Sequence, residues 1–521
     1  MKMRGVGRDH VRPWGAPSPC PKKRKNMKKK IIIIGGGVAG LSAGCYAQMN
    51  GFESEIYEMH DIPGGVCTSW TRKAYLFDHT LHWVIGSNKS TSLYPIFKDL
   101  GVADNVKFYY TERFKEITLG DKTFTSYTDV NKFEAELLRL FPEEKKGIKK
   151  YLRLIRKYIR FNPPMDRDFG DFGIVNFLKM FPFMISFFIL NKITIEDYFR
   201  KLFSNPDLRE ILFRLFPVKG LPALMCIMPL SFMHKKEGGF PLGGSLNFAS
   251  VIENKYLELG GKIHYKNKVK KIIIENDIAR GIELENGGIV SGDIVISAAD
   301  GRTTLYDMLN EKYLTDRIIW SYKNPSLWPP IMSISIGINR DFSGMPEINE
   351  FKLQKALLIG GKETNWVGFI HFCQDSAFAP KGKSVIKAQF ETDYFYWKNL
   401  YDNHNVEYHR AKKQVLNIFI DIMSERFPGF RDQIEVTDIA SPVTWENYTG
   451  NWQGSYEGWV PTIKAFTFGE TLPKELPGLR NFYMTGQWVT PGGGVPMCMA
   501  QGKILINKIV KNERKRKNSH A

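Results

Sequence analysis

Residues 31–47 read IIIIGGGVAGLSAGCYA, and this stretch decides the fold. The four isoleucines suit a central strand of a parallel sheet, because such a strand is buried on both faces. Directly after them, Gly35, Gly37 and Gly40 fit the spacing G-x-G-x-x-G. In that pattern the first glycine permits a tight turn, the second lets a diphosphate approach the main chain, and the third lets a helix pack close to the sheet. The stretch predicts a strand–turn–helix unit with a dinucleotide at the helix N-terminus.

The residues that follow this unit extend the pattern. Residues 53–57 read as a short second strand, and Glu58 ends it, where an acid accepts hydrogen bonds from ribose hydroxyls. Gly64 and Gly65 come next, a second glycine pair that a nicotinamide-binding domain has no reason to carry. An ordinary βαβ unit with an acidic strand end is the alternative that needs no ligand.

Two later segments repeat the combination of glycine turns, strands and helices. Residues 239–272 predict a glycine turn, an amphipathic helix that ends at the pair 260–261, and a strand. Residues 278–300 predict a hairpin with its turn at 286–288 and a strand that returns to the sheet. Residues 481–509 predict a last strand, a turn with three glycines in a row at 492–494, and a helix from near Met497 to Ile509. We expect the cofactor to fill the space that side chains of these three glycines would take.

Together these segments resemble the FAD-binding fold of the glutathione-reductase type. The runs PLGGS, DIVISAAD, SPVTWENYTGNWQGSYEGW and GQWVTPGGGVP resemble the phytoene desaturase, carotenoid isomerase and retinol saturase-like family in particular. Val66 departs from the family, which usually has arginine there. The resemblance implies an FAD held by Gly35, Gly37, Gly40, Glu58, Gly64 and Gly65, with Val269 beside the adenine and with Gly486, Gly493 and Val495 closing over the flavin.

The fold class expected from this resemblance is α/β, with a discontinuous Rossmann-like FAD-binding domain and an inserted α+β substrate domain. The FAD-binding domain is predicted to consist of residues 27–90, 236–304 and 471–512. The substrate-binding domain is predicted to consist of residues 91–235 and 305–470. Residues 1–26 read as a disordered leader and residues 513–521 as a basic tail.

The charge and the cysteines limit the classes of function. The net charge of +19 lies mostly at the two ends, because residues 1–30 carry +10 and residues 511–521 carry +4. The fold between them is close to neutral, so nucleic acid is not expected as a partner, whereas basic ends could rest on an anionic membrane surface. The six cysteines form no CxxC pair, which predicts no metal site and fits a reducing compartment such as the cytoplasm.

Two segments of the predicted substrate domain are rich in apolar side chains. Residues 177–190 read FLKMFPFMISFFIL, which is shorter than the ~20 residues that span a bilayer and contains Lys179 and Pro182. We therefore expect a buried or interfacial helix there, and not a transmembrane span. Residues 212–233 are also apolar, and they form either core or the wall of an apolar tunnel.

The expected function is an FAD-dependent oxidoreductase that acts on CH–CH or C=C bonds of a long apolar substrate. The resemblance implies a carotenoid or another polyisoprenoid, altered by desaturation, saturation or isomerisation through hydride transfer, with NAD(P) or a quinone among the redox partners. No residue is established as catalytic; His79 and His82 in FDHTLHW are the weak candidates, and packing alone is the alternative role for both.

Two other functions stay open at this point. A flavin-dependent amine oxidase would act on a small polar substrate and use an aromatic cage, for which Trp445, Trp452 and Trp459 are available. A carrier like the Rab GDP-dissociation inhibitors would have a related fold without flavin. The intact glycine turns argue against the carrier, because a protein that binds no flavin has no need to keep the diphosphate approach open.

Overall fold

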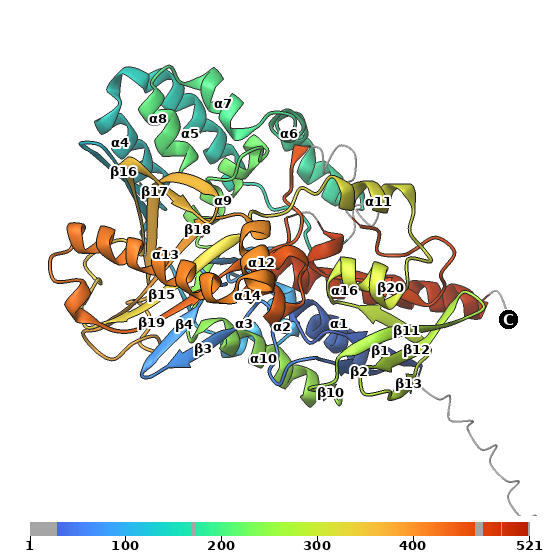
Figure 1. Cartoon of the computed structure of the whole chain (residues 1–521). Coiled ribbons are helices and arrows are strands. Elements are labelled where there is room, and N and C mark those ends of the chain that lie inside the picture. Colours follow the sequence, from blue (N-terminus) through green and yellow to red (C-terminus); the bar gives the residue numbers. More distant parts are fainter. Residues whose placement is uncertain (1–28, 168–172, 464–471, 491, 519–521) are drawn as a thin grey trace, which may run out of the picture.

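The computed structural model describes residues 29–167, 173–463, 472–490 and 492–518. Figure 1 shows a parallel sheet with its helices beside a second, larger sheet that carries a lobe of helices. The expected leader, residues 1–26, lies outside the described residues. Within the expected basic tail, residues 513–518 are helical, because helix α16 (Val495–Asn518) continues through them.

The first part is built on a five-stranded sheet in which every pair of strands is parallel. Its order is β10-β2-β1-β14-β20, and its strands are β10 (Lys262–His264), β2 (Glu53–Tyr57), β1 (Lys30–Ile34), β14 (Ile294–Ser297) and β20 (Phe482–Met484). The isoleucine strand β1 lies at the centre, and Ile31, Ile32 and Ile33 have no exposed surface. The predicted α/β class with a discontinuous Rossmann-like sheet is therefore confirmed.

The two faces of this sheet are covered by different layers. Ile31 and Ile33 pack in one core with helices α1 (Val38–Met49), α10 (Gly244–Glu258) and α16. Ile32 and Ile34 pack in another core with the antiparallel sheet of β11 (Val269–Glu275), β12 (Ile278–Leu284) and β13 (Ile289–Ser291). The predicted hairpin at 286–288 joins β12 to β13, and its Gly287 has φ +85°.

The second part is built on a seven-stranded mixed sheet. Its order is β19-β15-β18-β17-β16-β7-β8, where β7–β16 is parallel and the other pairs are antiparallel. Helices α12 (Tyr394–Asn403) and α13 (Asn405–Arg426) pack on one face. The strands are β7 (Arg113–Leu119), β8 (Lys122–Tyr127), β15 (Ile331–Ile338), β16 (Ile348–Ile359), β17 (Lys362–His371), β18 (Ser384–Glu391) and β19 (Ile434–Ala440).

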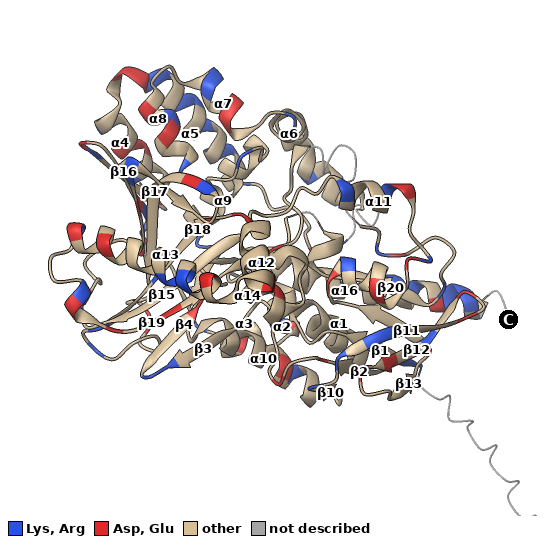
Figure 2. Cartoon of the chain, viewed as in Figure 1, with Lys and Arg blue, Asp and Glu red and all other residues tan. Residues whose placement is uncertain are grey.

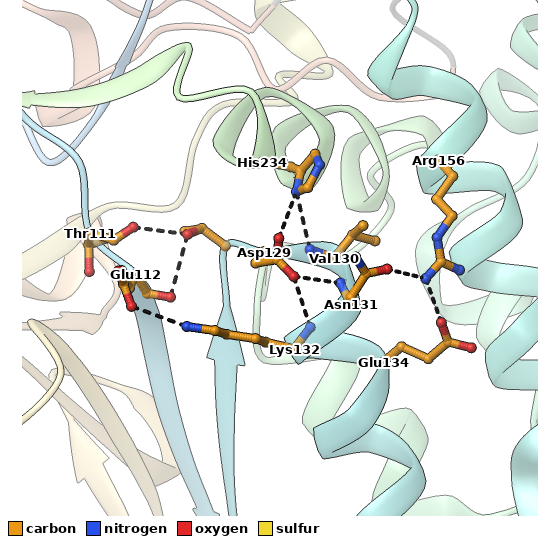
Figure 3. A network of polar contacts seen from close by, with 10 residues as sticks. Thr111, Glu112, Asp129, Val130, Asn131, Lys132, Glu134, Arg156 and His234 are labelled. Atoms are coloured by element: carbon orange, nitrogen blue, oxygen red, sulfur yellow. Dashed lines mark hydrogen bonds and ion pairs between the residues drawn. The ribbon is translucent and has the colours of Figure 1, made fainter.

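A lobe of helices is attached at the β7–β8 end of this sheet (Figure 1). Asp129 caps the first helix by accepting hydrogen bonds from the main-chain N–H groups of Asn131 and Lys132, and His234 of α9 accepts one from Val130 (Figure 3). These bonds fix the start of α4 against α9. The helices are α4 (Val130–Leu140), α5 (Lys145–Ile159), α6 (Ile174–Asn191), α7 (Ile195–Leu202), α8 (Pro206–Phe213) and α9 (Met228–His234).

Two short segments pack with the domain to which the sequence did not assign them. The hairpin of β3 (Ser69–Arg72) and β4 (Tyr75–Asp78) packs against the seven-stranded sheet, where Tyr75 and Phe77 meet Phe372 and Phe378. Helices α2 (Tyr94–Asp99) and α3 (Val102–Asn105) pack in the core under α1 and α10. A small sheet of β5 (Val84–Ile85), β9 (Gly238–Pro241) and β6 (Phe108–Tyr109) also links the two parts of the chain.

Candidate cofactor and substrate site

In the first glycine turn, the fold itself requires two of the glycines but not the third. Gly35 has φ +98°, and a Cβ atom on Gly40 would lie 2.0 Å from the carbonyl oxygen of Gly35, so the fold itself requires these two glycines. Gly37 is different, because its φ of −67° suits any residue and the atom nearest to an added Cβ is 3.7 Å away. The packing of the protein gives no reason for the missing side chain at Gly37, and a ligand that approaches the main chain does.

The second glycine pair lies directly beside the first turn. The main-chain N–H of Gly64 donates a 3.0 Å hydrogen bond to the carbonyl oxygen of Gly36, and Gly64 forms a parallel bridge with Gly37. Gly64 and Gly65 have φ +105° and +61°. The structure thus brings together both glycine turns at the N-terminus of α1, where a helix favours a bound anion.

Glu58 lies against these turns with its carboxylate turned inward. One of its carboxylate oxygens accepts a 2.6 Å hydrogen bond from the N–H of Gly36, and the other accepts a 2.9 Å bond from the N–H of His60. Each oxygen keeps a second lone pair, which is what a ribose hydroxyl requires. Val269 begins β11 two residues after Asn267, whose N–H donates to the carbonyl oxygen of Glu58, so the predicted adenine contact lies next to the predicted ribose contact.

The third glycine segment meets the same helix end but differs from expectation. Gly486 (φ +98°) follows β20, and an added Cβ would lie 3.1 Å from the Cβ of Ala39 in α1. At Gly493 an added Cβ would lie 2.4 Å from the carbonyl oxygen of Glu457, and at Gly492 it would lie 3.3 Å from Pro461. The expectation that a cofactor fills this space is wrong for Gly492 and Gly493, because residues 457–461 of the chain fill it. Val495 begins α16 immediately after this turn.

Four side chains near the third glycine segment and the turn at 78–82 are half-buried: His82, Tyr456, Glu457 and Cys498. Burial raises the pKa of the Glu457 carboxyl to about 8, and no hydrogen bond or ion pair joins it to another side chain in the part of the chain that the structure describes. The Glu457 carboxyl is therefore neutral at pH 7.

A turn of residues 78–82 fixes the other side of the site. Asp78 accepts hydrogen bonds from the hydroxyl of Ser245 at 2.7 Å and from the N–H of Thr80 at 2.9 Å. The hydroxyl of Thr80 donates to the carbonyl oxygen of Val66, directly after the second glycine pair. The segment FDHTLHW is therefore tied to the residue that follows the second glycine pair.

The two predicted histidines both face the seven-stranded sheet. His79 Nε2 shares a 2.8 Å hydrogen bond with the hydroxyl of Ser335, and its ring stacks on Trp70 with the centroids 5.2 Å apart. Its Nδ1 is buried without a hydrogen-bond partner. His82 Nε2 is hydrogen-bonded to the amine of Lys387. Burial, and then the charge of Lys387, lower the pKa of both imidazoles well below the usual value, so both rings are neutral at pH 7.

Lys387 is a site residue that the sequence reasoning missed. It lies in the middle of β18, is 1% exposed, and has no carboxylate within ion-pair distance among the described residues. Burial lowers the pKa of its amine to about 7, with Asp78 acting in the opposite direction. The signal in the sequence is a lysine inside the apolar run SVIKAQF, where a surface strand would alternate polar and apolar residues.

Of the three tryptophans considered for an aromatic cage, Trp452 and Trp459 both pack on Tyr322, whereas Trp445 packs on His79. Trp459 is 2% exposed and donates a hydrogen bond to the carbonyl oxygen of Trp488 in the core below the parallel sheet. Trp452 packs on Tyr322 beside that core. Trp445, on α14 (Pro442–Thr449), is the one that contacts a candidate residue, because it meets the edge of His79 with the centroids 5.8 Å apart.

Unpaired polar atoms lie along the third glycine segment. The buried hydroxyl oxygens of Thr485 and Thr490 have no hydrogen-bond partner in the described residues, and neither has Trp445 Nε1 beside His79. An unpaired buried polar atom costs about 1–3 kcal/mol, so a ligand at this segment would gain by pairing with the two hydroxyls. The open approach at Gly37 and the inward Glu58 provide the other half of the binding site.

Comparisons with known proteins agree with this geometry. Residues 33–100 match the family model of an NAD(P)-binding Rossmann-like domain. The chain is 24% identical to prolycopene isomerase 2 of an Oncidium hybrid cultivar over 95% of this chain and 86% of the relative. It is 22% identical to a 4,4'-diapophytoene desaturase of Methylomonas over 94% and 96%, and 23% identical to an all-trans-retinol 13,14-reductase of Danio rerio over 92% and 86%.

Solved structures show the same fold at lower identity. An oxidoreductase of Methanosarcina mazei aligns with a TM-score of 0.60 and 16% identity over 92% of this chain and all of its own. A cyclohexylamine oxidase of Brevibacterium oxydans aligns with a TM-score of 0.56 and 11% identity over 94% and 100%. These relatives and folds support a flavin or related dinucleotide as the cofactor. The chain is an oxidoreductase related, along nearly its whole length, to the carotenoid desaturases, carotenoid isomerases and retinol reductases.

Proposed function

We propose that the protein binds FAD and oxidises or reduces carbon–carbon bonds of a long apolar substrate, a carotenoid or another polyisoprenoid. The observation that carries this proposal is the glycine cradle for a dinucleotide, with titratable side chains on the neighbouring loops that burial keeps mostly neutral. Around pH 7 the carboxyl of Glu457 and the rings of His79 and His82 are neutral, and the amine of Lys387 is close to its midpoint. An apolar chain can enter such a site without separating ion pairs.

Each part of the site has a role in this proposal. The turns at Gly37 and Gly65 hold the diphosphate, Glu58 holds a ribose, and Gly486 with the start of α16 holds the ring end of the cofactor. FAD supplies the hydride chemistry when it is bound. The protein orients the substrate and excludes water, and NAD(P) or a quinone exchanges electrons with the same site.

The proposal predicts a selective change in the absorbance of the FAD-loaded protein. In the absence of oxygen, a polyisoprenoid that carries reducible or oxidisable bonds should bleach or restore the flavin bands, depending on the state from which the protein starts. Putrescine and cyclohexylamine, as small polar controls, should leave the bands unchanged because the carboxyl of Glu457 is mostly protonated at pH 7 and offers a cation no full negative charge. Bleaching by the amines with no response to isoprenoids would contradict the proposal and favour an amine oxidase.

The proposal includes contact with a membrane surface through helix α6. Eight of the seventeen exposed large hydrophobic side chains in the described residues lie in its 18 residues, and only 11% of the helix is buried. The helix carries Lys179 and no acidic residue, and Lys192 follows it (Figure 2). Of the two predicted alternatives, a buried or an interfacial helix, this exposure favours the interfacial one, because Phe183 and Leu190 are the residues of the helix that are buried. An interfacial helix at an anionic bilayer fits this surface, and the apolar substrate would be drawn from the bilayer.

Replacing Phe181, Ile185 and Phe188 together by aspartate should reduce binding to phosphatidylglycerol-containing vesicles by at least about 100-fold, because each side chain contributes about 1.5–3 kcal/mol on burial. Co-sedimentation with vesicles measures this. The matched control is Ile289→Asp, which changes an equally exposed isoleucine on β13. Binding that persists in the triple variant but is lost in high salt would contradict the role of α6 and point to the basic ends.

A further inference from the structure

Two neighbouring strands each hold one histidine of the turn at 78–82. In the antiparallel pair β15–β18, Ser335 lies directly opposite Lys387, so their side chains share one face of the sheet. Ser335 bonds His79 and Lys387 bonds His82. The other face of the same strands, with Ile334, Ile336 and Ile386, packs under α13. Lys387 therefore lies on the face away from α13, and its hydrogen-bond partner among the described residues is the imidazole of His82.

Other groups around Lys387 leave its amine without a counter-ion. Asp78 is the carboxylate whose charge raises the pKa of Lys387, and its two oxygens accept hydrogen bonds from Ser245 and Thr80. From β17 the opposite residue is Ile370, and Phe372 presents its ring 5.8 Å from the amine. His79 is the other titratable group that acts on His82. A buried lysine is rarely kept without a paired charge unless its proton has a use.

The hydrogen bond between Lys387 and His82 couples the state of one group to the other. A charged amine can only donate, so His82 Nε2 must then accept and the ring proton must sit on Nδ1. A neutral amine has a lone pair, so His82 Nε2–H can donate to it and Nδ1 becomes an acceptor. His82 is half-buried, so this change alters what its ring offers to a group that reaches it.

We propose that Lys387 is a positioning residue that sets the tautomer of His82, and that the Lys387–His82 pair stores one exchangeable proton. This inference rests on the proposed function for its purpose. Saturation of a C=C bond adds a hydride and a proton, and desaturation removes both. With the hydride exchanged with the cofactor, the proton is given or taken by the pair: a proton that leaves His82 Nδ1 is replaced at Nε2 by one from Lys387, and the pair ends one proton poorer.

The direct test is ¹⁵N NMR of the full chain labelled in its histidine rings, with the His82 signals assigned through His82→Gln. In the unaltered protein the His82 nitrogens should change from the Nδ1–H form as the pH rises through about 7, where Lys387 loses its proton. In Lys387→Met this change should disappear. Lys383→Met is the matched control, because Lys383 pairs with Glu435 directly before the same strand begins. Unaltered His82 signals in Lys387→Met would overturn the proposal.

A second measurement separates this inference from the proposed function. In the FAD-loaded protein, Lys387→Met should remove the ionisation near pH 7 from the pH profile of kcat and leave KM for the isoprenoid within about twofold. Lys387→Gln serves as a second variant of similar length. The NMR result requires no substrate, so it stands or fails even where no isoprenoid is turned over. A pH profile that keeps its ionisation near 7 in both variants would overturn the proton-storing role.

Discussion

Replacing Gly37 by alanine should leave the free protein folded and yet weaken FAD binding by about 100-fold or more. The φ of −67° suits alanine, and the nearest atom to its Cβ, at 3.7 Å, is at ordinary contact distance. A diphosphate held at this turn would be displaced by the methyl group and lose charge-assisted hydrogen bonds, which are worth about 1.5–3 kcal/mol each. Thermal unfolding of the free protein and a titration with FAD measure the two effects separately.

The matched control for this prediction is Gly40→Ala, three residues along the same turn. There the new Cβ would lie 2.0 Å from the carbonyl oxygen of Gly35, so helix α1 must move away from the sheet and the free protein itself should be destabilised. Equal FAD affinity in Gly37→Ala and the unaltered protein would show that no diphosphate approaches this turn. Equal losses of folding stability in both variants would contradict the packing difference between the two glycines.

Lys387→Met should stabilise the folded protein by several kcal/mol at neutral pH. The pKa of this amine is lowered from 10.5 to about 7 on folding, and each unit corresponds to about 1.4 kcal/mol. A pKa lowered in the folded state means that the unfolded chain binds more protons between these two values. The penalty is therefore complete below about pH 7 and is relieved as the pH rises toward 10.5. Methionine has a similar length and carries no charge to desolvate.

The measurement is urea unfolding of both proteins across this pH range. The free energy of unfolding attributable to residue 387 should rise with pH in the unaltered protein and stay flat in Lys387→Met. Lys383→Met, at a partly exposed paired lysine directly before the same strand, should change little. A loss of stability in Lys387→Met at neutral pH would mean that the contacts of the amine outweigh the cost of burying it, which contradicts the penalty expected for a buried amine without a counter-ion in the described residues.

The parts of the site that the sequence predicts correctly are those set by local geometry. G-x-G-x-x-G after four isoleucines requires a strand, a turn and a helix within 20 residues, and the distances between Gly36, Gly64 and Glu58 follow from that unit. Helix caps and hairpin turns such as 286–288 are local in the same way. Such features can be predicted from a single sequence because the residues that form them are close together in the chain.

The parts that the sequence does not predict depend on which distant residues meet. Gly493 is crowded by Glu457 and not by a cofactor, which only the packing of two remote loops decides. Helix α6 is as apolar as a core helix, and its exposure follows from its place on the rim of the lobe. Lys387 faces His82 across 305 positions of sequence. The β3–β4 hairpin likewise crosses the predicted boundary because its aromatic partners come from residues 372–385.

The measurement that tests the central claim most directly is the binding of FAD and of NAD(P) to the cofactor-free protein. The glycine cradle, the inward Glu58 and the unpaired hydroxyls of the third glycine segment predict one FAD per chain, with quenched flavin fluorescence and no displacement by millimolar NAD(P). Binding of NAD(P) at the cradle with no binding of FAD would contradict the account, because the second and third glycine segments would then hold no flavin.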